Sequence, residues 1–165
     1  MIIRPETEAD RAAISDITKA AFAGHPYSNQ TEHRIIDALR AANALTISLV
    51  AEDKGEIVGH VAFSPVTIAD GSIAWYALGP LSVRPDRQRQ GIGTALVTTG
   101  LKMLEATGAH GCVLAGDHRY YGRFGFVTVP QLVTEGVPDE HVLARSFDEY
   151  RPVGCIAFHP AFFVS

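Results

Sequence analysis

A change of hydrophobic period near residue 46 constrains the fold more than any other feature of the sequence. Three strand-like runs follow one another from there: "TISLVAED", "EIVGHVAFSPVTIA" and "SIAWYALGPLSV". The segments "DKG" and "DG" separate these runs, and both are typical of tight hairpin turns. Residues 46–84 are therefore expected to form an antiparallel meander.

After this meander the pattern becomes helical over residues 91–106. Ile92, Leu96 and Met103 mark one apolar face, and a second face lies beside it, which predicts a helix buried on a wide side. The run "GCVLAG" that follows is typical of a buried strand. A strand, a helix and a strand in succession form a crossover with a parallel pair. The expected fold class is α/β (α+β), a mixed, mostly antiparallel sheet with one parallel pair and flanking helices.

The remaining segments flank this centre. "MIIRP" predicts a first strand, and Thr7 with Asp10 resembles a capping box before a helix. A second helix is expected near residues 30–42 and a short one at "DHRYYGRF". "FVTV" and "RPVGCIAFHPAFF" predict two more strands, and residues 130–147 give no clear pattern.

Length and composition narrow the class of protein. The 165 residues suit one domain, expected over residues 1–165, and 47% apolar with 19% charged residues is typical of a globular protein. A net charge of −4 argues against nucleic acid as a partner. No signal peptide or bilayer-crossing segment is evident, so we expect a cytoplasmic protein without a membrane partner. Cys112 and Cys155 lie among apolar residues, which predicts reduced core positions.

This acidic chain gathers positive charge where the meander gives way to the helix. The stretch "RPDRQRQGIG" holds three arginines, two glutamines and two glycines. Backbone N–H groups at a helix start lack partners, and the helix dipole there favours negative charge. Gly91 and Gly93 let the backbone come close and adopt unusual angles. With charge from Arg87 or Arg89, the pattern predicts a seat for a phosphorylated cofactor.

Two familiar nucleotide sites do not match this stretch. The chain has no G-x-x-x-x-G-K-[ST], which argues against a P-loop. "GIGTAL" lacks the third glycine of G-x-G-x-x-G and follows a meander, which argues against a dinucleotide-binding fold. Taken alone, a glycine pair at a helix start fits equally well a turn that caps a structural helix.

The order of residues in this loop strongly resembles the GNAT superfamily of N-acetyltransferases. "QRQGIG", residues 88–93, is similar to the [QR]-x-x-G-x-[GA] segment that binds the pyrophosphate of acetyl-CoA in that family. "YYGRFGF" resembles a second signature, F-Y-x-x-x-G-F. The resemblance implies the GNAT acyl-CoA N-acyltransferase fold, whose fourth and fifth strands splay apart. The chain looks most like small, stand-alone bacterial members.

The resemblance also implies how acetyl-CoA is held. Pantetheine lies between the splayed strands and pairs with the backbone of the fourth strand, as an added strand would. Pro80 cannot donate to a ladder, so it marks where regular pairing fails, although an edge-strand proline is an alternative. The expected cofactor-binding residues are Leu81, Ser82, Val83, Arg87, Gln88, Arg89, Gln90, Gly91, Ile92, Gly93, Thr94 and Arg123.

Tyr121 is the expected catalytic residue, because the tyrosine four residues before the glycine of the second signature faces the CoA sulphur in the family. A tyrosine pKa near 10 exceeds a thiol pKa near 8.5, so full proton transfer would be uphill by about 2 kcal/mol. We therefore expect Tyr121 to stabilise the departing thiolate mainly by a hydrogen bond. A half-buried core tyrosine is the structural alternative, and Tyr120 is expected to point elsewhere.

No general base maps onto the fourth strand, where family members often carry one. Candidates elsewhere, each with a structural or solvated alternative, are His60, Glu32, Glu52 and Asp117. The seven histidines show no metal-ligand spacing, so no metal is expected. Cys112, in an apolar strand, is a poor nucleophile.

The expected function is acetyl-CoA-dependent transfer of an acetyl group to a primary amine by direct attack in a ternary complex. The partner would be a small-molecule or peptide amine, and a homodimer is an open possibility. One alternative is a GNAT-fold module that binds or senses acyl-CoA without turnover. Another is transfer of a longer acyl group.

Overall fold

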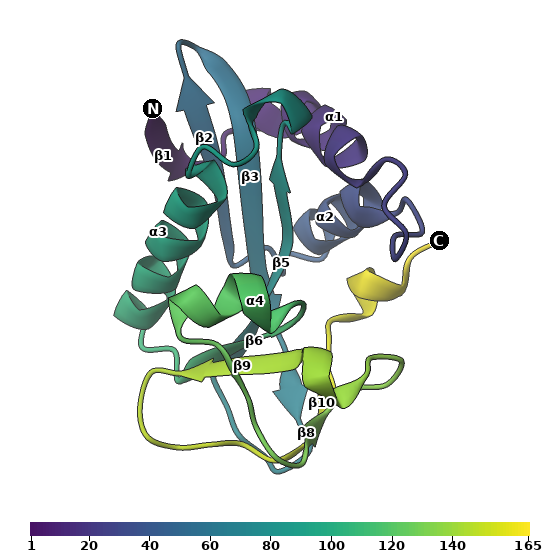
Figure 1. Cartoon of the computed structure of the whole chain (residues 1–165), viewed down its shortest axis with the longest axis vertical. Helices are drawn as coiled ribbons and strands as arrows, with labels where there is room; N and C mark the ends of the chain where they lie inside the picture. The colour runs from purple at the N-terminus through teal and green to yellow at the C-terminus, as the bar shows by residue number, and fades with distance from the viewer.

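The computed structural model describes residues 1–165, and its main feature is a seven-stranded sheet (Figure 1). The strand order is β1-β2-β3-β5-β6-β9-β7. The bounds are β1 Ile2–Pro5, β2 Ile47–Asp53, β3 Glu56–Pro65, β5 Trp75–Val83, β6 Gly111–Ala115, β7 Val127–Thr128 and β9 Val142–Ser146. Within this sheet only β5 and β6 run parallel, so the predicted mixed sheet is confirmed.

The predicted meander is confirmed as β2, β3 and β5, but its second strand ends earlier than expected. Lys54 and Gly55 form the turn between β2 and β3 with φ of 51° and 79°. The segment predicted as one strand over "EIVGHVAFSPVTIA" divides after Pro65. After Pro65 the chain leaves the large sheet, and Ile68 is buried with Trp75 in a second apolar cluster.

That second cluster is covered by a separate three-stranded sheet in the order β4-β10-β8. Its strands are β4 Thr67–Ile68, β8 Leu132–Val133 and β10 Gly154–Ala157. The long final strand predicted at "RPVGCIAFHPAFF" is therefore wrong beyond β10. Pro160 starts a 3-10 helix there, η5 Pro160–Phe163, and the His159 Nδ1 atom accepts its Ala161 N–H. Residues 130–147, unassigned from sequence, contain β8, β9 and the 3-10 helix η4 Asp139–His141.

Helices cover both faces of the large sheet (Figure 1). Their bounds are α1 Arg11–Phe22, α2 Glu32–Ala41, α3 Ile92–Ala106 and α4 His118–Tyr121, with further 3-10 turns η1 Glu8–Asp10, η2 Pro85–Arg87 and η3 Gly122–Phe124. The predicted capping box of Thr7 and Asp10 is present before α1. Ile14 and Ile36 pack against Val50, which places α1 and α2 on one face. No helix of the protein combines the length and apolar content needed to cross a bilayer.

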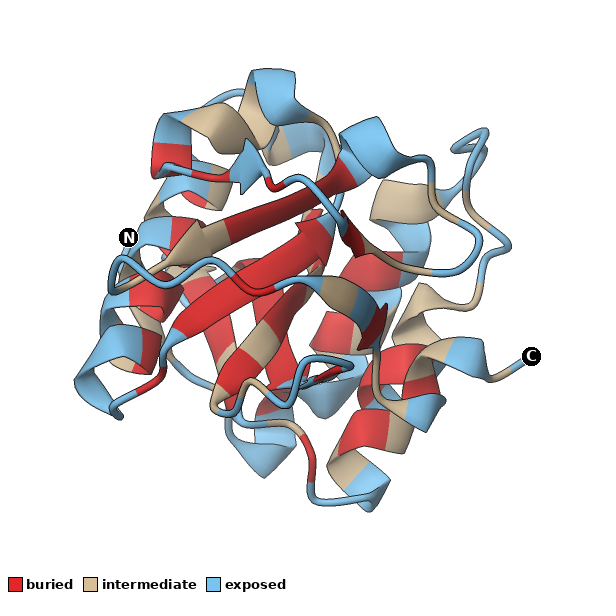
Figure 2. Cartoon of the chain, turned by 90° about the horizontal axis from the view of Figure 1, so that it is seen from below, coloured by how far each residue is buried: buried red, intermediate tan, exposed pale blue.

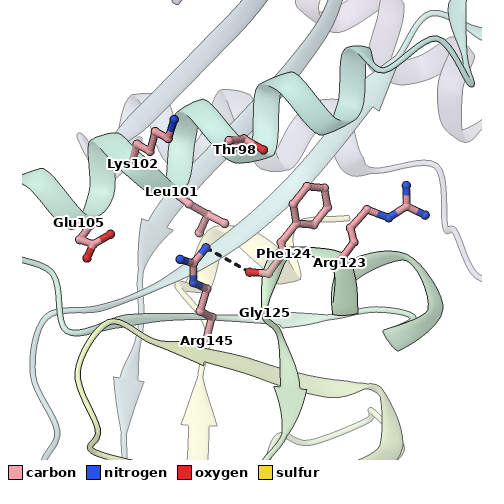
Figure 3. A pocket seen from close by; sticks show the side chains of 8 residues that line it. All are labelled: Thr98, Leu101, Lys102, Glu105, Arg123, Phe124, Gly125 and Arg145. Atoms are coloured by element: carbon pink, nitrogen blue, oxygen red, sulfur yellow. Dashed lines mark hydrogen bonds between the residues drawn. The ribbon is translucent and has the colours of Figure 1, made fainter.

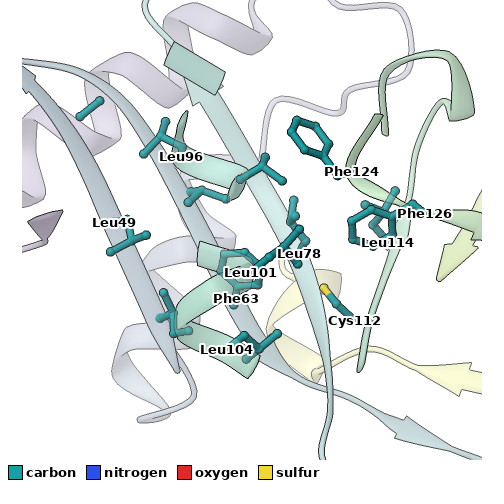
Figure 4. Close-up of a cluster of buried hydrophobic side chains, with 14 of the residues drawn as sticks. Leu49, Phe63, Leu78, Leu96, Leu101, Leu104, Cys112, Leu114, Phe124 and Phe126 are labelled. Atoms are coloured by element: carbon teal, nitrogen blue, oxygen red, sulfur yellow. The ribbon is translucent and has the colours of Figure 1, made fainter. Parts of the chain in front are cut away.

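Helix α3 packs on the other face and forms the main core with β2 and β3 (Figure 4). Leu96, Leu101 and Leu104 point from the helix toward Leu49 and Phe63. Buried residues concentrate on the sheet and on the sides of the helices that face it (Figure 2). Helix α3 is thereby held against β5, and its first turn has a fixed place beside that strand.

The two cysteines differ in burial. Cys112 on β6 is buried, as predicted, but Cys155 on β10 is exposed, so its predicted core position is wrong. The reason is strand alternation: Ile156 points into the second cluster, and its neighbour Cys155 points to solvent.

Candidate functional site

Strands β5 and β6 pair at one end and then separate. Their parallel ladder joins Trp75–Ala77 to Gly111–Val113 and goes no further. On its other side β5 stays paired with β3 as far as Val83. The predicted splay is confirmed, and one edge of β5 beyond Ala77 has no strand partner.

The other edge of β5, which pairs with β3, is interrupted at Gly79 and Pro80. The ladder between β3 and β5 shifts register there, between Val61 and Phe63, and the Gly79–Pro80 peptide is cis. Proline has no N–H to donate, so a regular ladder cannot continue through it. The predicted interruption at Pro80 is confirmed.

Leu81 and Val83 turn their backbone groups toward the unpaired edge. The Arg84 N–H donates to the Val58 carbonyl at 2.9 Å, so the backbone groups of Arg84 face β3. Leu81 and Val83 alternate with Arg84 and face the opposite way. The Val83 carbonyl accepts the Gln88 side-chain amide at 3.1 Å, while Leu81 has no partner on this edge. An extended ligand can add to this edge as a strand.

The start of α3 lies directly after the arginine-rich loop and has free backbone donors. Gly91 caps the helix with a φ of 84°, a left-handed angle that favours glycine. The Ala95 N–H is the first to bond within the helix, to the Gly91 carbonyl at 3.0 Å. Three preceding N–H groups have no protein acceptor: those of Ile92, Gly93 and Thr94. Such a turn is suited to an anion.

Carboxylates already pair with two of the three loop arginines. The Arg84 Nε atom lies 2.7 Å from Asp86 Oδ1, and Arg87 Nη2 lies 2.9 Å from Asp53 Oδ2. Arg89 is exposed and forms no ion pair. Of the three arginines in this loop, Arg89 is therefore the one whose charge the protein leaves uncompensated.

Two further predicted cofactor residues have structural partners. Gln90 Oε1 accepts the Arg87 Nε–H at 3.0 Å. The Ser82 side chain is buried under α1, with its Oγ atom 3.4 Å from Thr18 Oγ1. The Ser82 hydroxyl therefore faces α1, and its backbone groups, like those of Arg84, face β3, so Ser82 presents no polar group to the unpaired edge.

Tyr121 lies in the apolar cluster between α4 and the separating strands. Its ring packs against Phe126 with centroids 6.0 Å apart, and against the strand end at Gly116. Burial raises the pKa of Tyr121 above its usual value near 10. The phenol therefore stays protonated at neutral pH and can donate a hydrogen bond.

Tyr120 reaches a different place from Tyr121. Its hydroxyl oxygen is 2.7 Å from where a Cβ atom at Gly93 would lie. Gly93 has an ordinary helical backbone, so the expectation that it needs an unusual angle is wrong, and Gly91 alone of the pair has one. Position 93 favours glycine instead because the Tyr120 hydroxyl lies too close to where a Cβ atom would be. Sequence reasoning missed this contact, although two adjacent tyrosines on one short helix must point in different directions.

Comparison with known proteins decides the family. Residues 11–126 match the family model described as "Acetyltransferase (GNAT) family". The chain belongs to the GNAT acetyltransferase family. The match includes β5, the arginine-rich loop, α3 and α4, which are the segments that build the geometry above.

This GNAT chain also resembles solved structures along nearly its whole length. A GNAT family acetyltransferase from Brucella melitensis in complex with acetyl-CoA is 48% identical, with a TM-score of 0.87 over 98% of this chain and 97% of that one. YhbS from Escherichia coli in complex with CoA is 28% identical, with a TM-score of 0.88 over 98% and 91%. The N-acetyltransferase YhbS of Escherichia coli K12 aligns at 35% identity over 127 residues, covering 76% of this chain and 73% of YhbS.

The GNAT chain has an open hollow of about 420 Å³ between α3 and η3 (Figure 3). Three cationic side chains line it, from Lys102, Arg123 and Arg145, with the Glu105 carboxylate at one end. Arg145 is anchored, because its Nη1–H donates to the Phe124 carbonyl at 3.1 Å. The residues of α3 that line it lie between Thr98 and Glu105, beyond the turn that carries the free N–H groups.

His60 is a structural residue. It is fully buried on β3, and Nε2 lies 2.8 Å from the Ser48 Oγ atom. The single Ser48 proton goes to the Glu6 carboxylate, so His60 must donate from Nε2. Burial lowers the pKa of His60 to about 4, so the ring is neutral at pH 7.

The other candidate bases also have structural partners. Glu52 Oε1 accepts from Arg4 at 3.1 Å, and Glu32 Oε1 accepts from Ser28 at 2.6 Å. Asp117 caps α4, and its bonds from Arg119 lower its pKa to about 2. Each of these three carboxylates therefore accepts a hydrogen bond from another side chain of the protein.

Cys112 is a poor nucleophile in this structure. Burial raises the pKa of its thiol well above the usual range, which disfavours the reactive thiolate. No group of three or more His, Cys, Asp or Glu side chains is arranged to hold a metal ion.

Proposed function

We propose that this GNAT protein is an acetyl-CoA-dependent N-acetyltransferase that moves an acetyl group to a primary amine while both substrates are bound. The observation that carries the proposal is the unpaired edge of β5 beside the free N–H groups of α3. An extended pantetheine that ends in a pyrophosphate needs these two features together. Complexes of the Brucella melitensis relative with acetyl-CoA and of YhbS with CoA support the same cofactor here.

The residues present fit that cofactor. Leu81 and Val83 would bind the amides of the pantetheine, and the N–H groups of the first turn of α3 would bind the pyrophosphate. Each hydrogen bond to a charged oxygen contributes about 1.5 to 3 kcal/mol. Several such bonds, with the charge of Arg89, hold a pyrophosphate without a metal ion.

When bound, acetyl-CoA supplies a thioester whose carbonyl carbon accepts the amine nitrogen. The new C–N bond would form as the C–S bond breaks, with the electron pair staying on sulphur. The proton that the amine loses would pass to the thiolate, directly or through water, so that the products are an acetamide and free CoA thiol. We assign to Tyr121 a hydrogen bond that stabilises the departing thiolate. A buried Cys112 favours direct transfer over a covalent enzyme intermediate.

The acceptor in this proposal is a small-molecule or peptide amine. A lysine-like amine has a pKa near 10.4, so about one molecule in a thousand is neutral near pH 7.4, at a cost of about 4 kcal/mol. An α-amine, with a pKa near 8, costs about 1 kcal/mol. Acceptors of the second kind are therefore expected to react faster unless the site itself removes the proton.

The test combines binding with turnover. Titration calorimetry should give a saturable Kd for CoA, and a panel of amines should give amine-dependent release of free thiol from acetyl-CoA. Binding of CoA without thiol release by any amine would favour a module that binds or senses acyl-CoA. A faster reaction with a longer acyl-CoA would favour the longer acyl group, and failure to bind CoA would refute the proposal.

A further inference from the structure

The Tyr120 hydroxyl links α4 to the first turn of α3. The phenol oxygen lies against Gly93, at the position that a Cβ atom there would crowd. Gly93 and Thr94 both carry N–H groups without a protein acceptor. One hydroxyl from a separate element is thus held beside the free donors of the predicted pyrophosphate turn.

The ring of Tyr120 and its hydroxyl have separable roles. The ring packs edge-on against Tyr121 and Phe124, with centroids 4.9 and 5.6 Å apart. The Arg123 guanidinium lies 4.6 Å over its face, and Arg123 Nε donates to the Tyr120 carbonyl at 2.9 Å. A phenylalanine would make all of these contacts, so packing alone does not account for the hydroxyl.

The surroundings of this hydroxyl are rich in donors and positive charge. Arg123 is exposed and has no carboxylate partner, and the three N–H groups of α3 lack acceptors. Burial raises the pKa of Tyr120, so its phenol is a protonated donor at neutral pH. A phosphate group, with several acceptor oxygens and negative charge, complements all of these groups at once.

We propose that Tyr120 is a cofactor-binding residue whose hydroxyl donates a hydrogen bond to the pyrophosphate of acetyl-CoA. This inference rests on the proposed function, because it takes the same cofactor to lie across the first turn of α3. The hydroxyl groups of the two adjacent tyrosines then have different roles. Tyr120 holds the cofactor by its phosphate end, and Tyr121 acts at the sulphur.

The test is titration calorimetry on Tyr120→Phe with CoA and with 3′-dephospho-CoA, which keeps the pyrophosphate but lacks the ribose phosphate. Loss of one hydrogen bond to a charged oxygen should raise the Kd about tenfold to a hundredfold for both probes. The factor should hardly change between low and high salt, because the substitution removes no charge. Tyr121→Phe, the same chemical change one residue away, should leave both Kd values within about twofold of the wild type.

The outcomes separate this inference from the proposed function. Equal Kd values for wild type and Tyr120→Phe would overturn the role of Tyr120 and leave the cofactor assignment intact. A loss with CoA but not with 3′-dephospho-CoA would also overturn it, since the contact would then be to the ribose phosphate. Failure of the wild type to bind either probe would overturn the proposed function and this inference together.

A second variant tests the same contact without altering Tyr120. In Gly93→Ala the new Cβ would lie 2.7 Å from the Tyr120 hydroxyl oxygen, so the hydroxyl must move, and CoA binding should weaken about tenfold. In the Tyr120→Phe background the nearest ring atom of residue 120 would be 3.9 Å away, which is ordinary contact. Gly93→Ala should therefore weaken binding much less there. Equal effects of Gly93→Ala in the two backgrounds would overturn the inference.

Discussion

At the scale of single residues, the site depends on two neighbouring tyrosines with different surroundings. Successive residues on a helix point about 100° apart, so Tyr120 and Tyr121 cannot reach the same target. Tyr121 packs among Phe124 and Phe126, whereas the Tyr120 hydroxyl lies against Gly93. The sequence motif predicts that Tyr121 faces the sulphur, and the fold adds that the Tyr120 hydroxyl contacts Gly93.

We predict that Tyr121→Phe lowers kcat about tenfold to a thousandfold and leaves the KM for acetyl-CoA nearly unchanged. The phenylalanine keeps the ring, and the lost hydroxyl contributes only as charge develops on the sulphur. Burial already raises the pKa of Tyr121 above 10, so any loss of rate from its ionisation should begin only above pH 10. Steady-state kinetics of thiol release at several pH values measures both effects.

The informative control is Tyr120→Phe, which should raise the KM for acetyl-CoA more than it lowers kcat. The reverse pattern, with kcat lost in Tyr120→Phe and kept in Tyr121→Phe, would show that the two roles are exchanged. Full activity in both variants would mean that neither hydroxyl stabilises the thiolate, which then takes its proton from water or from the acceptor amine.

At the scale of elements, the loop between β5 and α3 carries less free charge than its composition indicates. Arg84 and Arg87 are paired with carboxylates from Glu56, Asp86 and Asp53. Such exposed pairs stabilise a fold only slightly, but they compensate the charge of their arginines. Arg89, the unpaired member, is the one best placed to attract a phosphate.

We predict that Arg89→Ala weakens CoA binding about two- to fivefold at low ionic strength and less at high ionic strength, because salt screens exposed charges. Arg84→Ala is the matched control in the same loop and should have a much smaller effect. Titration calorimetry at two salt concentrations measures both variants. A loss in Arg89→Ala that grew with salt, or an equal loss in Arg84→Ala, would contradict the electrostatic role.

The close contact between α3 and β3 leads to a second prediction at the scale of elements. In an exposed helix interior, glycine to alanine stabilises by up to about 1 kcal/mol. At Gly100 the new Cβ would lie 2.3 Å from a ring carbon of the buried Phe63. We therefore predict the opposite sign, a loss of about 1 to 3 kcal/mol in the free energy of unfolding.

Urea denaturation of Gly100→Ala checks this, with the exposed Thr98→Ala on the same helix as control. The control should change the free energy of unfolding by less than about 0.5 kcal/mol. A Gly100→Ala protein as stable as the wild type would mean that Phe63 moves aside without cost.

At the scale of the whole molecule, a partly buried polar network joins the end of the first strand, the sheet and α2. Arg40 on α2 donates to both oxygens of Glu6, at 3.0 and 3.1 Å, and Ser48 connects Glu6 to His60. The His60 ring lies within 4.0 Å of the Glu6 carboxylate and also feels the Arg40 charge. Burial outweighs the carboxylate and keeps His60 neutral.

This network predicts that stability falls in mild acid. The pKa of His60 is lowered from 6.5 to about 4, so between these values the unfolded chain binds a proton that the folded protein does not. The free energy of unfolding should therefore fall as pH drops from 6.5 to 4, by on the order of 3 kcal/mol from this residue. Urea denaturation of the wild type at pH 7, 5.5 and 4.5 measures the slope.

His60→Asn should be less stable than the wild type at pH 7 but should lose less stability between pH 6.5 and 4.5. The exposed His25→Asn serves as control and should keep the wild-type slope. An unchanged slope in His60→Asn would assign the acid sensitivity to other groups.

How much of this could be predicted depends on how far apart the interacting residues lie in the chain. Hydrophobic period predicted α3 and the meander, and turn residues predicted the Lys54–Gly55 hairpin, because each signal acts within a few neighbours. The final strand was overextended, because an apolar run does not reveal that Pro160 begins a 3-10 helix. The exposure of Cys155 was also missed, since it depends on which face of β10 meets the second cluster.

The sequence by itself determined the family, the mixed sheet, the interruption of the ladder at Pro80 and the glycine turn before α3. These follow from local backbone preferences and from the order of residues in short motifs. Only the tertiary structure decided that Asp53 engages Arg87, that His60 is neutral, and that the Tyr120 hydroxyl lies at Gly93. Each of these facts needs segments from different elements to meet, and that meeting is set by how the helices and the sheet bury their apolar faces together.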